Sequence, residues 1–477
     1  MSMGSREDGK QPPLWVATSE LARGEGHIFY RRLNELLARH GFDRFVEGLV
    51  EEKKIFAETL GRPSIPPGTY MRMMFVGYFE GLSSERAIAW KCADSLSLRE
   101  FLGYGLTEAT PDHSTLSGLR RKFPEEVHRE VFDWVLKVAQ EEGLLKGRKV
   151  AIDATTLEAN AAMRTIVRRA DGASYQKYLK KLAKAEGIKD PTPEDLGRMD
   201  RKRKGKKVSN KEWKSPSDPD ARITKMKDGT THLAHKAEHA VDLGSGVIVA
   251  AEIHLADSGD TTTLPQTLTR AEASVERANP EGGIQEVVAD RGYHSGAVVG
   301  DLHQRGYNTC IPERRQKRRR NWKRLSRKVG EREARRRQRA FHLNRRRLKS
   351  DAGKRLLRKR GETVERSFAH VCETGGMRRV HLRGRANILK RYQVHVAAFN
   401  LSIVLRSLIG LGTPRGFQGR KALLAHALSS ILSSMRDLIR SLFDQLGPFS
   451  LEPRYTQPLC PSPQLAVAWR YRHRVCK

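Results

Sequence analysis

Two aspartates lie where apolar strands would normally exclude them. Asp153 interrupts the run "VAIDATTLEAN" (150–160), and Asp290 closes the run "VVAD" before Gly292. Strands disfavour Asp, and a carboxylate held away from water costs several kcal/mol without compensation. If the two strands are neighbours, the carboxylates converge and raise each other's pKa. A hard divalent cation, which prefers oxygen ligands, would remove that conflict.

A third acid, Glu365, lies at the edge of an apolar helical stripe formed by Val364, Phe368 and Val371, from which it can reach the end of a sheet. Glu362, one turn earlier, is the rival candidate. Three carboxylates around divalent ions are suited to phosphoryl transfer, because the metal activates a hydroxyl and stabilises the leaving oxygen.

Each acid also has an ordinary alternative role. Asp153 could accept hydrogen bonds from Thr155 or Thr156, and Asp290 could be a turn former before "RG". Glu365 could pair with Arg366 on its own helix. Spacing alone leaves these alternatives open.

The charge of the chain indicates its class of partner. The 477 residues carry a net charge of +34, with 38% hydrophobic residues, enough for a sizeable core. Such an excess of positive charge is best neutralised by a polyanion, most commonly nucleic acid. The segment 314–360 holds 24 Lys or Arg against 3 Asp or Glu, a net charge of +21. We expect it to contact nucleic acid, the alternative being a disordered basic linker or localisation signal.

Other classes of protein are disfavoured. The cysteines form no C-x-x-C pair, which argues against a zinc ribbon or a disulfide framework; they are Cys92, Cys310, Cys372, Cys460 and Cys476. The N-terminus has no apolar signal core. The most apolar segment, 394–412, is interrupted by His395, Asn400 and Arg406 and therefore predicts a buried helix, not a membrane span.

The elements that must position the acids follow from periodicity. Residues up to about 145 predict helices, including 20–42, 69–82 and 125–145, with a further helix capped by Thr110 and begun by Pro111. From Gly147 the pattern predicts a strand, a hairpin turning at "LGSG" (243–246), then helix, strand, helix and strand up to about residue 313. This order indicates a mixed sheet covered by helices. The stretch 163–231 is basic and turn-rich, typical of an insertion or mobile arm.

At these residues the sequence resembles the DDE transposases of bacterial insertion sequences, from about Pro63 to Leu408. The blocks "TPDHSTLS", "VAIDATTLEAN", "VVADRGYHSG" and "VERSFAHVCETGGMRRVHLRGRANILKRY" occur in the family's order. The resemblance implies an α/β, RNase H-like fold with a mixed five-stranded sheet flanked by helices and preceded by a mostly helical domain. It implies that Asp153, Asp290 and Glu365 are catalytic and bind Mg²⁺ or Mn²⁺ as two ions. Asp153 would then be balanced by metal and not by a protein cation.

The family pattern has an Arg four residues before the glutamate and a Lys seven residues after it. Here those positions hold Gly361 and Cys372, and Arg358, Arg378 or Arg379 are candidates to contact phosphate instead. The basic residues expected to bind DNA are Arg201, Lys202, Arg203, Lys204, Arg318, Arg319, Arg320, Arg335, Arg336, Arg337, Arg378 and Arg379.

The function expected from the resemblance is that of a transposase that binds the terminal inverted repeats of its element, cleaves DNA and joins the ends to a target. The alternatives are an RNase H-like nuclease without strand transfer and a non-catalytic basic nucleic-acid-binding protein. We expect a helical DNA-binding domain (1–145), a catalytic domain (146–410) with basic insertions at about 163–231 and 314–358, and a C-terminal helix with a loose tail (411–477). The partners expected are double-stranded DNA and a second copy of the chain on DNA, without a membrane, in the cytoplasm and associated with the nucleoid.

Overall fold

The structure is a computed structural model that describes residues 24–56, 64–203, 209–226, 229–313 and 321–417, together with Trp15, Ala17, Glu20, Leu21 and Met435. The chain divides into two compact units, residues 1–426 and 427–477, and all elements below belong to the first. Of the C-terminal helix and tail expected over 411–477, residues 411–417 and Met435 are described and the rest lie outside the described residues.

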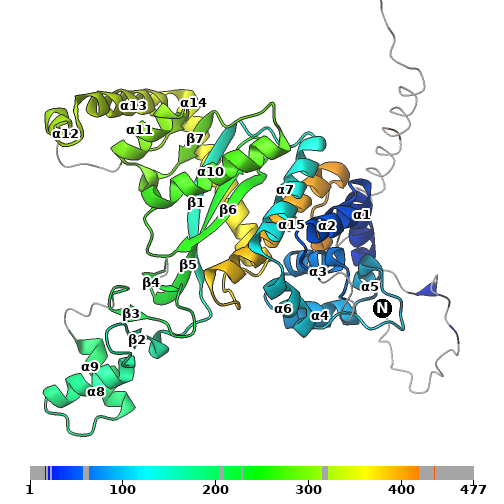
Figure 1. The fold of residues 1–477 in the computed structure, drawn as a ribbon, viewed down its shortest axis with the longest axis horizontal. Coiled ribbons are helices and arrows are strands. Elements are labelled where there is room, and N and C mark those ends of the chain that lie inside the picture. The colour runs from blue at the N-terminus through cyan, green and yellow to red at the C-terminus, as the bar shows by residue number, and fades with distance from the viewer. Residues whose placement is uncertain are drawn as a thin grey trace, which may run out of the picture. The chain divides into compact units, whose positions relative to one another are not determined.

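Helices form the described part of the chain before residue 145, as predicted (Figure 1). They are α1 (Glu25–Arg39), α2 (Phe42–Glu52), α3 (Pro67–Phe79), α4 (Glu85–Asp94), α5 (Leu96–Leu102), α6 (His113–Lys122) and α7 (Glu125–Glu141). The predicted start of α6 is wrong by two residues. Asp112, not Thr110, is its N-cap, because the Asp112 carboxylate accepts hydrogen bonds from the backbone N–H of Thr115 and from the Ser114 hydroxyl.

The mixed sheet follows the strand order β6-β5-β1-β7-β8. Its strands are β1 (Lys149–Glu158), β5 (Thr231–Asp242), β6 (Ile248–Leu255), β7 (Glu286–Ala289) and β8 (Asn308–Cys310). β5 pairs antiparallel with β1 and β6, whereas β1, β7 and β8 run parallel. The predicted α/β class is confirmed: a mixed sheet is flanked by helices and preceded by a helical region. A sixth strand, β4 (Arg222–Lys225), pairs with the first residues of β5 and was not predicted.

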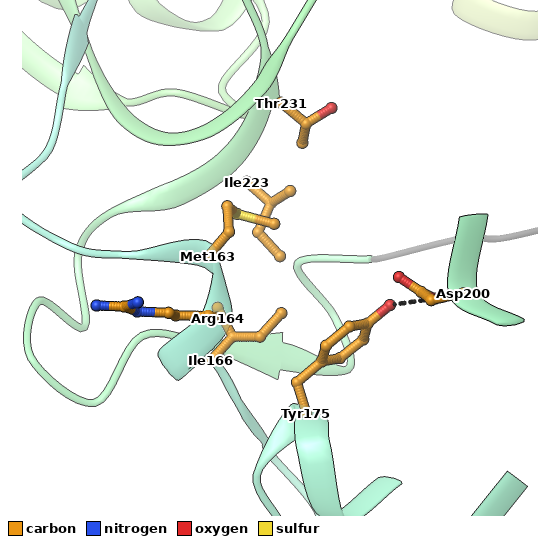
Figure 2. Close-up of a pocket in the computed structure, with 7 residues that line it drawn as sticks. All are labelled: Met163, Arg164, Ile166, Tyr175, Asp200, Ile223 and Thr231. Atoms are coloured by element: carbon orange, nitrogen blue, oxygen red, sulfur yellow. Dashed lines mark hydrogen bonds between the residues drawn. The ribbon is translucent and has the colours of Figure 1, made fainter. Parts of the chain in front are cut away.

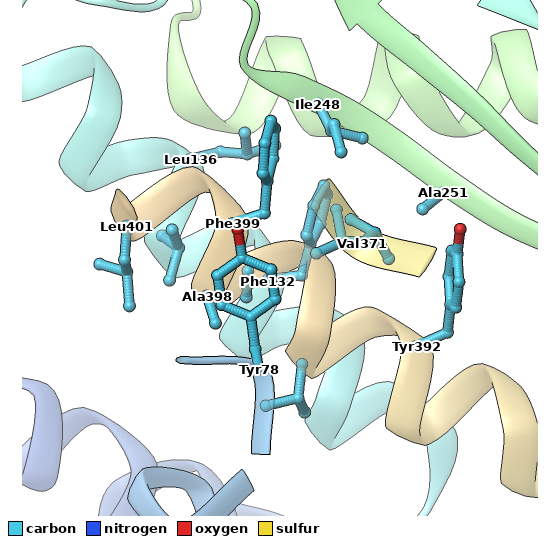
Figure 3. Close-up of a cluster of buried hydrophobic side chains, with 14 of the residues drawn as sticks. Tyr78, Phe132, Leu136, Ile248, Ala251, Val371, Tyr392, Ala398, Phe399 and Leu401 are labelled. Carbon is cyan, nitrogen blue, oxygen red and sulfur yellow. The ribbon is translucent and has the colours of Figure 1, made fainter. Parts of the chain in front are cut away.

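One hydrophobic core joins the N-terminal helices to the sheet. Its centre is α15 (Arg385–Ile409), which packs against α3, α7 and β6. Figure 3 shows side chains of these elements, with Val371, meeting in the cluster. The side-chain amide of Asn400 accepts from the Ile248 N–H and donates to the Ile248 carbonyl, and Gln393 donates to the Ala251 carbonyl. Side chains of α15 thus supply hydrogen-bond partners for backbone groups along the edge of β6.

The burial of α15 accounts for its apolar composition. Arg385–Gly416 is long and apolar enough to cross a membrane, and it is the stretch that meets this criterion among the described residues. Most of α15 from Ile388 to Leu405 is buried within the protein. The prediction of a buried helix over this segment is confirmed.

The remaining helices flank the sheet and its edge. α10 (Asp260–Ala278) packs on β5, β6 and α7, and α11 (Gly296–Gln304) packs on β8. The basic segment after β8 forms α12 (Trp322–Val329), α13 (Glu331–Lys349) and α14 (Asp351–Phe368).

The described part of the basic segment is anchored to the sheet. The buried side chain of Asn344 on α13 accepts from the Ile311 N–H and donates to the Ile311 carbonyl. Ser350 ends α13 and also caps α14, where its hydroxyl accepts from the Gly353 N–H. A Cβ at Gly353 would clash with the Arg347 carbonyl, so the two helices meet at a tight elbow.

The stretch 163–231, expected to be a turn-rich insertion or mobile arm, contains regular structure. It holds α8 (Tyr175–Ala185), α9 (Pro193–Lys202) and the pair of short antiparallel strands β2 (Val167–Arg168) and β3 (Trp213–Lys214). Two small hydrophobic clusters separate from the main core support it, one around Trp213 and one formed by Leu179, Ala183 and Leu196. We call residues 163–226 the inserted subdomain.

Candidate active site

The pairing of β1 with β7 places the two predicted aspartates next to each other. Ile152 pairs with Ala289 in parallel register, and Asp153 and Asp290 are the residues that follow on each strand. Both side chains are half-buried. Burial raises the pKa of Asp153, and the charge of Asp290 adds to that increase. Neighbouring carboxylates in a partly buried site therefore repel each other, as the sequence predicted.

Asp153 is compensated by an arginine. Its Oδ1 accepts from the Ala154 N–H at 2.8 Å, and its Oδ2 accepts from Arg360 Nη1 at 2.7 Å. The Asp153 and Arg360 side chains are 26% and 17% exposed, so the ion pair is partly shielded from water. The prediction that no protein cation balances Asp153 is wrong for this structure. Arg360 precedes the buried Val364 by one helical turn and so lies on the face of α14 that packs on the sheet.

Asp290 leaves β7 and caps the short 3₁₀ helix η3 (Arg291–Tyr293). Its Oδ1 accepts from the Gly292 N–H at 2.7 Å. A Cβ at Gly292 would stand 2.9 Å from Asp290 Oδ1 and would clash with Asp260 Oδ2, so a third carboxylate lies close to this turn. Asp260, the first residue of α10, is held by Lys236 Nζ at 2.7 Å.

A buried network of hydrogen bonds fixes the turn after Asp290. Glu238 is fully buried on β5 and accepts from Thr263 and Tyr293, each at 2.7 Å, and from Thr267. Burial alone would raise the pKa of Glu238, but hydrogen bonds from His254 and Thr267 and the Lys236 charge hold the pKa below its usual value. Because the Tyr293 hydroxyl donates to Glu238, the residues that follow Asp290 are tied to β5.

Glu365 lies on the exposed side of α14. Two side chains of α14 on either side of it contact the strands next to Asp153. Arg360 binds Asp153, and Ser367 Oγ lies 2.9 Å from Nδ1 of His239, the residue paired with Asp153 in the sheet. Glu365 therefore belongs to the stretch of α14 that crosses the sheet at Asp153. Glu362 is likewise exposed.

One of the two positions that depart from the family pattern, Cys372, is shielded from solvent. Cys372 is buried in the π-helical segment η4 (Ala369–Thr374), and burial raises the pKa of its thiol to about 11. Arg378 instead reaches β1, where it lies 3.3 Å from Thr155 Oγ1 and from the Thr156 carbonyl. Thr155 is on the same face of β1 as Asp153. Arg360, which no sequence argument singled out, and Arg378 thus flank Asp153.

The other residues predicted to bind DNA are dispersed. Arg201 and Lys202 are exposed at the end of α9, whereas Arg203 is bonded to the hydroxyls of Tyr175 and Tyr178. On α13, Arg335 pairs with Glu331, and Arg336 and Arg337 pair with Glu333. Arg379 is 63% exposed and 3.7 Å from Glu158. Lys204, Arg318, Arg319 and Arg320 lie outside the described residues.

The donor set at Asp153 and Asp290 suits a hard divalent cation, because its atoms are carboxylate oxygens whose joint ionisation is unfavourable. Among the residues that the structure describes, no group of three His, Cys, Asp or Glu is already arranged around a metal position. The Asp153 Oδ2 atom faces Arg360 instead.

Comparison with known proteins gives a consistent result. A family model described as "Transposase domain (DUF772)" matches residues 18–122, and one described as "Transposase DDE domain" matches residues 145–401. A solved structure, the Mos1 transposase paired-end complex with left transposon end, shares 12% identity over 70% of this chain and 85% of that chain, with a TM-score of 0.17. That score is too low to support an argument about fold, and no curated protein matches the chain. The predicted resemblance is confirmed by the family models, the second of which covers more than half of the 477 residues. The chain therefore belongs to the transposase DDE domain family.

Proposed function

We propose that the chain is a metal-dependent DNA transposase whose catalytic carboxylates are Asp153, Asp290 and Glu365. The observation that carries the proposal is the register of β1 and β7, which sets Asp153 and Asp290 side by side. The α14 helix crosses the sheet at Asp153 and carries Glu365. These acids lie in a chain with a net charge of +34, which suits a polyanionic substrate.

Asp153, Asp290 and Glu365 would hold Mg²⁺ or Mn²⁺, as two ions. When bound, divalent ions supply activation of a hydroxyl and charge stabilisation for an in-line displacement at phosphorus. The residues of the chain have supporting roles. Arg360 must release the Asp153 carboxylate before that oxygen can serve as a ligand. The turn at Gly292, held through Tyr293 and Glu238, keeps Asp290 in place.

The proposed substrate is double-stranded DNA, first the terminal inverted repeats of the element and then the target. Arg378 and Arg379 lie where β1 ends, with partly exposed guanidinium groups that can take a phosphate. On α13, the exposed Arg335 presents a further cationic group. Two copies of the chain would act together, one at each end of the element, in the cytoplasm at the nucleoid.

The experiment is cleavage and joining of supercoiled DNA that carries the ends of the element, with Mg²⁺ or Mn²⁺. We expect Asp153→Asn, Asp290→Asn and Glu365→Gln each to abolish cleavage while DNA binding persists or tightens, because a repulsive charge near phosphate is removed. Glu362→Gln is the matched control, since Glu362 is exposed on the same helix one turn away. Its activity should equal that of the unsubstituted chain.

Other outcomes would assign other functions. Cleavage without joining would identify a nuclease. Unchanged cleavage in all three variants would exclude the proposed site. DNA binding without cleavage by the unsubstituted chain, equal in all three variants, would favour a non-catalytic DNA-binding protein. Loss of cleavage in Glu362→Gln but not in Glu365→Gln would move the third carboxylate by one turn.

A further inference from the structure

The inserted subdomain carries a basic groove that the catalytic site does not use. The groove has a volume of about 540 Å³ and is lined by Arg168, Asp171, Ala173, Lys177, Tyr178, Lys180, Lys181 and Lys184. Five of these residues are cationic and one is acidic. The groove therefore differs from the neighbouring cavity of about 510 Å³, which is lined largely by Met163, Ile166, Tyr175 and Ile223 (Figure 2).

The four lysines form one face of α8. Their spacing, i, i+3, i+4 and i+7 from Lys177 to Lys184, places them within an arc of about 100°. The opposite face carries Leu179 and Ala183, which are buried against α9. The lysines are exposed, and among the described residues no ion pair joins any of them to a carboxylate. The Asp171 carboxylate accepts from the Ala173 N–H instead.

This arrangement costs stability in the free protein. Like charges at i,i+3 and i,i+4 on a helix repel one another and destabilise it. Lys177 and Lys184 are separated by about 10 Å along the helix axis. One strand of B-form DNA carries about three phosphates over that length. The row of ammonium groups thus matches the backbone of a duplex in both length and charge.

The scaffold under the lysines is rigidly built. The Tyr175 hydroxyl donates to Asp200 Oδ1 at 2.9 Å, a bond drawn in Figure 2, and so ties α8 to α9. The Trp213 ring packs edge-on against Tyr175 and Tyr178. Arg168 stacks over the Tyr178 ring at 5.6 Å and borders the lysine row. A platform held in this way presents the lysines with little further loss of backbone freedom on binding.

We propose that the α8 groove, formed by Arg168, Lys177, Lys180, Lys181 and Lys184, is a binding site for the phosphate backbone of duplex DNA. The inference rests on the proposed function, because it assumes that the chain acts on DNA. It assigns the inserted subdomain the role of holding duplex DNA through the backbone, without reading base sequence.

The test is the salt dependence of duplex DNA binding by the full chain, measured by fluorescence anisotropy without divalent metal. The variant K177Q/K180Q/K181Q/K184Q keeps the helix propensity and shape of α8. The control variant K137Q/K146Q/K149Q/K189Q removes four exposed lysines outside the groove. If each groove lysine neutralises one phosphate, the log–log salt slope falls by about 3–4, with a loss of affinity on the order of 10-fold or more at moderate salt.

A photocrosslinking amino acid at Lys181 gives a second readout that does not depend on charge. We expect it to cross-link to duplex DNA, whereas the same group at Lys137 on α7 does not. A groove variant whose salt slope changes no more than the control's, or an absence of cross-linking at Lys181, would overturn the inference. If the unsubstituted chain failed to bind duplex DNA, the proposed function would fall as well. If the unsubstituted chain bound and cleaved DNA and the groove variant did so equally well, the α8 groove would be excluded as a DNA-binding site, but the proposed function would stand.

Discussion

Replacing Arg360 tests whether its ion pair with Asp153 competes with the binding of a metal cation. The Arg360 Nη1–Asp153 Oδ2 distance is 2.7 Å and both side chains are less than a third exposed. Coulomb's law at an effective dielectric of about 20 gives about 4 kcal/mol for unit charges about 4 Å apart, before any cost of desolvation is subtracted. A charge-assisted hydrogen bond contributes roughly 1.5–3 kcal/mol net. A metal cation that binds Asp153 must first displace Arg360. The free energy gained by metal binding is therefore reduced by the contribution of the Arg360–Asp153 hydrogen bond.

The variant Arg360→Met should therefore bind Mn²⁺ about 10- to 100-fold more tightly, since about 1.4 kcal/mol corresponds to a factor of ten. The assay is Mn²⁺ binding by calorimetry without DNA, at mildly alkaline pH so that Asp153 remains ionised. Without metal, the same variant should lower the free energy of unfolding by about 1–3 kcal/mol, because the Asp153 carboxylate is left unpaired.

Arg358→Met is the matched control, because Arg358 is an exposed arginine two residues earlier on α14. It removes the same charge without touching Asp153 and should change Mn²⁺ affinity little. An equal affinity in Arg360→Met and Arg358→Met, or a weaker affinity in Arg360→Met, would refute the argument that Arg360 competes with metal for Asp153.

Two further predictions concern buried polar groups. Tyr293→Phe removes the hydroxyl that donates to buried Glu238, and urea denaturation should show the free energy of unfolding reduced by about 1–3 kcal/mol. The control Tyr104→Phe, at a half-buried position, should change the free energy of unfolding by less than about 0.5 kcal/mol. Equal effects of the two substitutions would argue against a stabilising role of the Glu238 network. Burial lowers the pKa of His128 and of His239 to about 3, below the value near 6.5 of the unfolded chain, so the unfolded chain binds more protons between these pH values. Stability should thus be full above about pH 6.5 and fall by roughly 1 kcal/mol per histidine for each pH unit below it; a urea midpoint that is constant from neutral pH to about pH 5 would contradict this.

The sequence was sufficient to predict the strands that carry Asp153 and Asp290, because apolar runs broken by a single acid are a local pattern. The register that makes the two aspartates neighbours, by contrast, is set by the parallel pairing of β1 and β7. That pairing follows from the packing of the whole sheet and was only a hypothesis beforehand.

Arg360 was missed for a different reason. Its position one turn before Val364 could have placed it on the packed face of α14. Instead, Arg360 was treated as part of a basic segment expected to contact nucleic acid. The insertion at 163–231 was predicted, but its regular structure was missed because its helices are short and lysine-rich. The apolar residues of α8 that pack on α9, Leu179 and Ala183, give a helical period too brief to stand out.

The elbow at Ser350 couples the position of α13 to that of α14. Since Ser350 both ends α13 and caps α14, no linker residues separate the two helices, and the position of α13 constrains the start of α14 directly. Because α14 also carries Arg360 and Glu365, the position of α13 helps to set the geometry next to Asp153.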